Sequence, residues 1–253
     1  MAKITMIART TLNEGAAFRA SGEVWDPEGD HGQDLAEFAG RACYQSWNRP
    51  SAKTSTNKGY IEHIIDVNHG SVLEHGSVSF YIEDVSRSLT HEFVRHRHFS
   101  YSQLSQRFVT VKPNAEHEAG VIPFVVPPLF VGDRVAGEIL SAAWDYAAHA
   151  YERLLERGNA LMGDGNMVQT SSAKVVREAA RCVLPNMTPT AIVVTGNHRA
   201  WREFLLKRGG AGADAEIHDL AIRLLGILKE TEPNVYADMY VGPDGHVWSK
   251  VEE

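Results

Sequence analysis

The amino-acid sequence predicts an α+β protein, a single helix-rich domain over residues 1–253 with a small mixed or antiparallel sheet. First, segments with apolar residues at helical spacing are longer and more numerous than β-branched or alternating segments. Second, 253 residues can enclose one large core, and no repeat or Pro/Gly/Ser-rich linker divides the chain. Third, 43% hydrophobic and 23% charged residues are typical of a soluble globular protein, which excludes disordered and fibrous classes.

The N-terminal part is predicted to contain one strand and two helices. The first twelve residues, MAKITMIARTTL, alternate as a strand does and lack the pattern of a secretory signal, so we expect a cytoplasmic protein. Apolar residues at helical spacing predict an amphipathic helix over Asp34–Trp47, with Asp34 as its N-cap, and a second helix over Asn57–Val67.

The middle of the chain is predicted to contain a strand and three helices. Ser77–Glu83 alternates between polar and apolar residues, which predicts a strand, and Ser86 then begins a helix expected to run through Arg97. The apolar run from 121 to 131 is interrupted by three prolines and is shorter than the roughly 18–20 residues of a membrane helix. Ala-rich segments after it predict long helices over Asp133–Arg157 and Val168–Val183.

The C-terminal third is predicted to contain one strand and two helices. The β-branched run Thr190–Thr195 indicates a buried strand. A helix over Ala200–Arg208 is expected to end at two glycines, and another should span Asp214–Glu230, before Pro233.

The charge distribution favours a small anionic ligand over a nucleic acid. The net charge is -7, and such an acidic chain does not suit a long phosphate backbone. Between Arg87 and Arg107, however, there are four arginines and a single acid, Glu92. This local excess of positive charge predicts one compact anion-binding site.

The segment His91–Arg107 is the densest in chemically active side chains. His91 and His96 are five residues apart, so they do not share the helix face that an HExxH zinc site requires. Arg95 and Arg97 are two residues apart, so they cannot share a helix face. This spacing indicates a helix end at which the two side chains bind two different anionic groups. A metal site built from scattered histidines stays open as an alternative, although no acid or cysteine keeps ligand spacing with them.

Other active-site patterns are missing from the sequence. Ser105 lies outside any GxSxG motif, and neither a GxGxxG motif after a strand nor a P-loop is present. Cys43 and Cys182 are far apart and belong to no CxxC pair, so we expect two small buried side chains and no disulfide, redox or zinc site.

The arginine-rich segment carries a resemblance to a known family. Arg95-His96-Arg97, seven residues and then Ser105 resemble the RHRx7S signature of the flavin-dependent thymidylate synthases. Further blocks in family order extend the resemblance over about residues 35–230, and it looks closest to the actinobacterial branch. These blocks are Gly40–Tyr44, His69–His75, Arg181–Pro185 and Thr195–Trp201.

The resemblance implies the reaction and its ligands. Members of this family convert dUMP to dTMP with methylenetetrahydrofolate as carbon donor and NADPH as reductant, through a bound FAD and with no metal or cysteine nucleophile. The implied FAD-binding residues are Ser71, Arg95, His96, Arg97, Gln103, Asn197, His198, Arg199 and Glu203. The implied dUMP-binding residues are Glu92, Phe93, Val94, Arg95, Gln103, Leu104, Ser105, Gln106, Arg107, Arg181 and Arg208.

The resemblance also implies individual roles. Arg208 is expected to lie at the uracil edge and to favour ionisation at N3, so it ranks first for catalysis, with Ser105 second. Tyr44 and His69 resemble positions near the flavin and the folate. Glu203 departs from the family, which commonly has His or Asn there. A homotetramer with active sites at its subunit interfaces is also implied.

Two functions from other classes stay open beside this one. An RNA-binding or nucleotide-binding module would use the Arg/His segment with Phe99 and Tyr101 as stacking platforms, although the net charge opposes it. A metallohydrolase would use the histidines. A bound flavin, a colourless protein or a bound metal would distinguish the three hypotheses.

Overall fold

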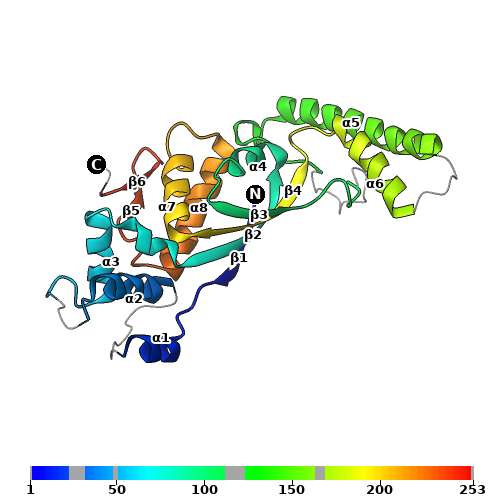
Figure 1. The fold of residues 1–253 in the computed structure, drawn as a ribbon. Coiled ribbons are helices and arrows are strands. Elements are labelled where there is room, and N and C mark those ends of the chain that lie inside the picture. The colour runs from blue at the N-terminus through cyan, green and yellow to red at the C-terminus, as the bar shows by residue number, and fades with distance from the viewer. Residues whose placement is uncertain (1, 23–31, 48–50, 112–122, 163–168, 252–253) are drawn as a thin grey trace. The chain divides into compact units, whose positions relative to one another are not determined.

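A computed structural model describes residues 2–22, 32–47, 51–111, 123–162 and 169–251 of the chain (Figure 1). Within these ranges, four strands form a sheet in the order β1-β2-β4-β3, and β5 pairs with β6 in an antiparallel ribbon. In this ribbon Met239 is opposite Ser249, and Val241 is opposite Val247. The strands are β1 (Lys3–Arg9), β2 (Ser77–Ser86), β3 (Phe99–Gln103), β4 (Pro189–Asn197), β5 (Met239–Val241) and β6 (Val247–Ser249).

Most of the described residues are helical, which confirms the predicted helix-rich α+β class. The α-helices are α1 (Glu14–Ser21), α2 (Gly32–Tyr44), α3 (Asn57–Asp66), α4 (Arg87–Phe93), α5 (Arg134–Met162), α6 (Gln169–Ala180), α7 (His198–Arg208) and α8 (Ala215–Thr231). Three short 3₁₀ helices are η1 (Gly70–Glu74), η2 (Pro128–Phe130) and η3 (Arg181–Val183).

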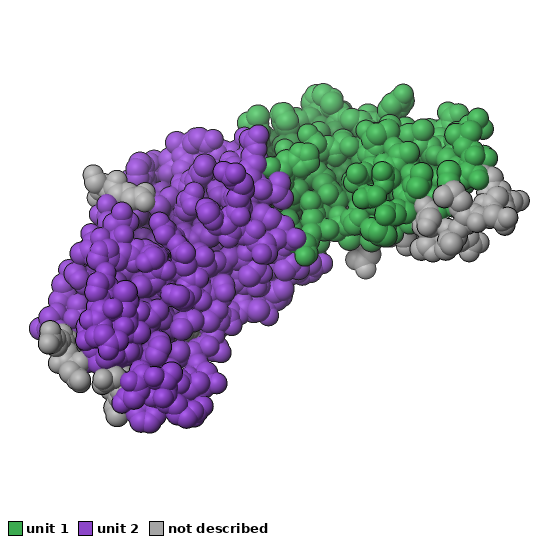
Figure 2. Space-filling view, viewed as in Figure 1, with its two compact units in different colours: residues 1–3, 83–91, 102–192 green, residues 4–82, 92–101, 193–253 purple. Residues whose placement is uncertain are grey.

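The chain divides into two compact units (Figure 2). Unit 1 comprises residues 1–3, 83–91 and 102–192, and unit 2 comprises residues 4–82, 92–101 and 193–253. In unit 1, α5 and α6 pack together, and α5 buries Trp144 and Tyr151 on the side that faces the core. The single domain expected over residues 1–253 stays a prediction.

The core of unit 2 is an aromatic cluster that joins β3 to α4 and α7. The rings of Phe93 and Phe204 stack with centroids 4.5 Å apart, and Phe99 meets Trp201 edge-on at 4.6 Å. Phe93, Trp201 and Phe204 are fully buried. Gly196 on β4 makes this packing feasible, because a Cβ there would lie 2.3 Å from the Phe99 ring. Burial of this much aromatic surface fixes the segment between α4 and β3 against α7.

The predicted elements are present, but three helix boundaries differ. Helix α2 begins at Gly32, so Asp34 lies in its first turn and is not the N-cap that the sequence predicted. Helix α5 continues to Met162, and α6 is followed by the 3₁₀ turn η3; Val168, the predicted start of that helix, lies outside the described residues. The helices expected to begin at Ser86 and Asp133 begin one residue later, at Arg87 and Arg134. The side chains of Ser86 and Asp133 cap them by accepting bonds from Leu89 N and Ala136 N.

The largest difference concerns the helix predicted over Ser86–Arg97. It ends at Phe93, because Arg95 N and His96 N bond to the carbonyls three residues earlier and the chain turns into β3. The helix prediction was therefore too long by four residues, whereas the helix end inferred from the spacing of Arg95 and Arg97 is correct. The strand β3 was not predicted.

Two further findings concern the surface. Cys43 and Cys182 are both exposed, so the expectation of buried cysteines was wrong. Among the described residues, no helix is long and apolar enough to cross a membrane.

Candidate functional site

Helix α7 carries the polar ridge around which the candidate site of unit 2 is built. The side chain of Asn197 caps the helix by accepting a bond from Ala200 N at 2.8 Å. Arg199, Glu203 and Lys207 follow at intervals of four residues, so they form this polar ridge along one face of α7. All three are exposed and line cavities.

Three cavities border this ridge. The RHR cavity, of about 170 Å³, is lined by residues 95–99 together with Ala200, Glu203, Lys207 and Arg208. The central cavity, of about 820 Å³, shares Glu203 and Lys207 with it. The Tyr44 cavity, of about 220 Å³, shares Arg199 with the central cavity and is also lined by Ser71. The predicted flavin residues that line these three cavities are Ser71, Arg95, His96, Arg97, Arg199 and Glu203.

Arg208, at the C-terminal end of α7, is bonded through all three guanidinium nitrogens. Its Nε donates to His96 Nε2 at 2.9 Å, its Nη1 forms an ion pair with Glu92 Oε2, and its Nη2 donates to Glu92 O at 3.2 Å. The Arg208 side chain is only 12% exposed. Its position is therefore fixed by Glu92 in the last turn of α4 and by His96 in the segment that follows.

His96 is a buried and neutral histidine. Burial, together with the positive charges of Arg208 and Lys207, lowers its pKa to about 4. Its ring packs against Phe204 at 5.1 Å, and its main-chain carbonyl accepts a bond from the Tyr101 hydroxyl. Burial also raises the pKa of Tyr101. The neutral imidazole can accept the Arg208 bond, which a protonated ring could not.

Tyr44 and His69 form a stacked pair at the Tyr44 cavity. Their rings are 5.9 Å apart and nearly parallel, and Tyr44 Oη lies 3.1 Å from His69 Nδ1. Tyr44 is 58% exposed, so its aromatic face is accessible. The structure therefore brings together the two residues that the resemblance placed near the flavin and the folate.

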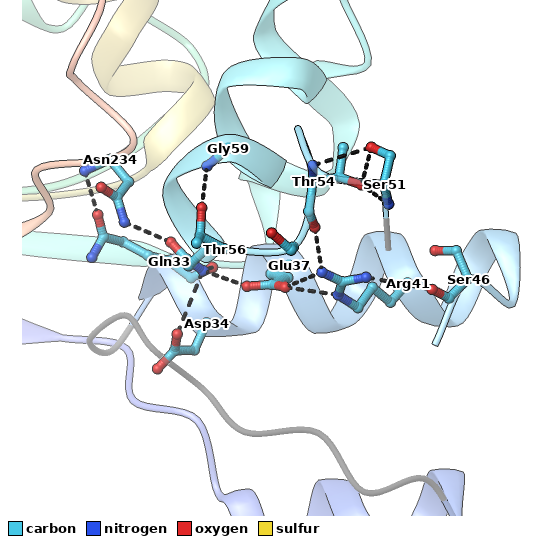
Figure 3. A network of polar contacts seen from close by, with 12 residues as sticks. Gln33, Asp34, Glu37, Arg41, Ser46, Ser51, Thr54, Thr56, Gly59 and Asn234 are labelled. Atoms are coloured by element: carbon cyan, nitrogen blue, oxygen red, sulfur yellow. Dashed lines mark hydrogen bonds and ion pairs between the residues drawn. The ribbon is translucent and has the colours of Figure 1, made fainter. Parts of the chain in front are cut away.

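A buried polar network holds the helix that presents Tyr44 (Figure 3). Arg41 and Glu37 on α2 form an ion pair whose side chains are 5% and 3% exposed. Arg41 also donates to Thr54 O at 2.8 Å, and Asn57 on α3 donates to Glu37 Oε2 at 2.8 Å. Because each buried charge has a partner, the network fixes α2 relative to α3.

Two of the predicted flavin residues of unit 2, His198 and Arg199, have side-chain partners within the protein. His198 is fully buried, its Nδ1 lies 3.0 Å from the Tyr236 hydroxyl, and burial lowers its pKa to about 4. Its side chain lines none of the three cavities, so the predicted contact of His198 with FAD gains no support from them. Arg199 is partnered with Glu74, Nη1 to Oε1, at 2.6 Å.

The remaining predicted dUMP residues divide between the two units. Phe93 is buried in the core of unit 2, and Val94 is 44% exposed. In unit 1, Gln103 Nε2 donates to Thr90 Oγ1 at 2.8 Å, Leu104 is 45% exposed and Gln106 is half-buried.

Ser105 and Arg107 follow in the same segment of unit 1. Ser105 Oγ accepts from Arg107 N at 3.3 Å. Arg107 forms an ion pair with Glu178 at 2.6 Å, while its buried Nε has no hydrogen-bond partner within the described residues. Arg177 Nε donates to the Arg107 carbonyl at 2.8 Å, so a second cationic side chain contacts the main chain of this segment.

Sequence reasoning gave no specific role to Arg87. Burial and the nearby charge of Arg181 lower the pKa of Arg87, so these two cations of unit 1 are close together. Its Nη2 donates to Leu104 O at 2.7 Å, and its buried Nε has no hydrogen-bond partner within the described residues. Two cations held together with an unused donor are typical of an anion site. The only sequence signal was the arginine excess of residues 87–107.

Lys207 is the second residue that sequence reasoning missed. It lines both the RHR cavity and the central cavity, next to Glu203. Its position four residues after Glu203 on the predicted helix was the available signal. Over the residues that the structure places, no three His, Cys, Asp or Glu side chains are arranged to hold a metal ion.

Comparisons with known proteins give a consistent result. The family model described as thymidylate synthase complementing protein matches residues 28–234. The chain is 50% identical over 243 residues to the flavin-dependent thymidylate synthase of Mycobacterium avium, covering 94% of this chain and 90% of that protein. It is 49% identical over 241 residues to the enzyme of the same name from Mycobacterium tuberculosis, with the same coverage.

A solved structure supports the fold. The UMP/dUMP methylase PolB of Streptomyces cacaoi, crystallised with 5-Br dUMP, superposes with a TM-score of 0.64. The alignment covers 94% of this chain and 93% of that one, with 18% sequence identity. At this identity, the similarity establishes a shared fold.

Proposed function

Since the chain belongs to the thymidylate synthase complementing protein family, the flavin-dependent thymidylate synthases, we propose that it methylates dUMP to dTMP, with methylenetetrahydrofolate as carbon donor and NADPH as reductant. The observation that carries this proposal is the meeting of the Arg95-His96-Arg97 segment with the C-terminal end of α7 at the RHR cavity. The actinobacterial relatives agree with the branch expected from the sequence.

The residues around α7 fit an FAD. The diphosphate of FAD is anionic, and Arg95, Arg97 and Lys207 supply cationic donors around the RHR cavity. The adjoining central cavity, about 820 Å³, has the size of a cofactor site and includes apolar as well as charged side chains. When bound, the flavin would carry hydride from NADPH to the pyrimidine, which makes a cysteine nucleophile unnecessary.

The arginines of unit 1 suit the phosphate of dUMP. Arg87 and Arg181 are close together, and Arg87 and Arg107 each keep a buried Nε donor without a partner in the described structure. Such donors favour a dianionic phosphate, which each guanidinium can bind in a bidentate manner. Ser105 and Gln103, in the same segment, would contribute neutral donors to dUMP.

Arg208 is proposed as the catalytic residue, with Ser105 second. A guanidinium stays cationic at any physiological pH, so Arg208 can stabilise the anion formed when the uracil ring loses the N3 proton. The Tyr44–His69 pair offers an exposed aromatic face to the folate or to the flavin ring. None of these roles requires a metal.

Self-association is part of the proposal. Val135, Ile139, Tyr146 and Leu161 lie on one face of α5 and are 55%, 64%, 80% and 67% exposed. An apolar face this large is typical of a protein–protein contact, which supports the homotetramer expected for the family. We place the protein in the cytoplasm, where dUMP and reduced folates are made.

The test is turnover by the purified protein. We expect a yellow protein that oxidises NADPH. It should form dTMP only when both dUMP and methylenetetrahydrofolate are present. Arg208→Ala serves as the inactive comparison. A colourless protein that binds RNA would favour the binding module, and a metal-dependent hydrolysis would favour the metallohydrolase; either result would refute the proposal.

A further inference from the structure

Arg208 is held by two residues before any substrate contact is made. A guanidinium has five N–H donors, and three of them are directed to His96 Nε2, Glu92 Oε2 and Glu92 O. The two remaining donors, one on each terminal nitrogen, are not used in these bonds to His96 and Glu92. Such an arrangement fixes the plane of the guanidinium while keeping donors for a ligand.

The environment of His96 suits an acceptor role. Its residue exposure is 9%, and its ring packs edge-on against Phe99 at 6.3 Å and against Phe204 at 5.1 Å. These contacts set the ring plane, and the bond from Arg208 shows that Nε2 is the unprotonated nitrogen, so Nδ1 carries the proton. The low pKa of His96 agrees with this tautomer, because the neutral ring persists at physiological pH.

Glu92 has a different part in the arrangement. Its side chain is 25% exposed, and it contacts Arg208 both through its carboxylate and through its main-chain carbonyl. The carbonyl is fixed by the end of α4, so one of the two contacts persists whatever residue occupies position 92. The side-chain contact adds an acceptor that matches the planar fork of the guanidinium.

We propose that His96 and Glu92 act as positioning residues that orient Arg208 towards the pyrimidine. The proposal rests on the proposed function for the identity of the substrate. The central residue of the Arg-His-Arg signature thus acts through Arg208, at the end of α7. The flanking Arg95 and Arg97, both exposed at the RHR cavity, keep the cofactor role.

The test compares His96→Leu with His96→Gln in the flavin-loaded enzyme. Leucine fills the space but accepts no hydrogen bond, whereas the glutamine side-chain oxygen can replace Nε2 as an acceptor. We expect His96→Leu to keep its flavin and to lose about tenfold or more in kcat at saturating dUMP, with a smaller change in KM. The reason is that the charge-assisted bond that orients Arg208 is lost. His96→Gln should recover most of the rate.

The matched control is His63→Leu. His63 lies on α3 in the same unit, is half-buried and lines none of the three cavities. It should have the wild-type rate. If His96→Leu does not fold, Glu92→Leu against Glu92→Gln gives the same comparison at a more exposed position. Loss of flavin in proportion to the loss of rate, or wild-type turnover by the leucine variant, would overturn the proposal.

A crystal structure of each variant tests the geometry without activity. In His96→Leu the Arg208 guanidinium should leave the plane that it has in the wild type, and in His96→Gln it should stay. An unmoved Arg208 in His96→Leu would contradict the positioning role. If the wild-type enzyme formed no dTMP, the proposed function would fail, and the crystal structures would still decide whether His96 holds Arg208.

Discussion

Acidification should destabilise this protein through His96. The pKa of His96 falls from 6.5 to about 4 in the folded chain, mainly because of burial. Between these values the unfolded chain binds a proton that the folded chain does not, so the free energy of unfolding decreases as the pH falls from 6.5 to 4 and is unaffected above 6.5. At 1.36 kcal/mol per pKa unit, the full effect is about 3 kcal/mol, of which about 2 kcal/mol is lost by pH 5.

The assay is urea unfolding of wild type and His96→Gln, followed by tryptophan fluorescence at one fixed protein concentration. Glutamine does not titrate, so the variant lacks this contribution. Wild type should lose about 2 kcal/mol more than the variant between pH 7 and pH 5, and the difference between the two proteins should be constant from pH 7.5 to 8.5. Parallel curves down to pH 5 would show that His96 is not a buried neutral histidine.

Three further predictions concern Arg97, the two cysteines and Arg208. Arg97→Ala should purify pale, because losing a charge-assisted bond to the diphosphate costs about 1.5–3 kcal/mol, or roughly ten- to a hundredfold in FAD affinity; full flavin occupancy would contradict the assignment. Cys43→Ala and Cys182→Ala should each keep most dTMP formation, since both side chains are exposed and no cysteine nucleophile is needed; a folded, flavin-loaded double variant without product would refute this. Arg208→Lys keeps the charge but not the planar fork, so its single-turnover rate should lie between those of wild type and Arg208→Ala. A wild-type rate for Arg208→Ala would reduce Arg208 to a residue that only positions substrate.

Local patterns in the sequence predicted most of the fold. Helices and strands were predicted correctly where the pattern of apolar residues along one element shows which side is buried, because such a pattern does not depend on distant contacts. Examples are the helical spacing in residues 34–47, 57–67 and 214–230 and the β-branched run in residues 190–195. The end of α4 could not be found in this way. The Phe93 and Phe99 rings pack against Trp201 and Phe204, more than a hundred residues later in the chain, and this packing forces the turn.

The candidate site was predicted unevenly for the same reason. The Arg-His-Arg motif located the cavity, because its residues are adjacent in sequence. The role of His96 depends on Arg208, 112 residues away, and no spacing rule connects them. Cys43 was expected to be buried from its residue type alone, yet it lies at the exposed end of α2 beside Tyr44.

Flavin oxidation measured together with product formation tests the central claim most directly. The FAD-loaded protein is reduced in advance, NADPH is removed, and dUMP and methylenetetrahydrofolate are added while the flavin absorbance and dTMP are followed. If the flavin is the hydride source and oxygen is excluded, dTMP should form in an amount equal to the flavin oxidised, and omission of dUMP should leave the flavin reduced. Formation of dTMP without flavin oxidation, or flavin oxidation without dTMP in the absence of oxygen, would contradict the account.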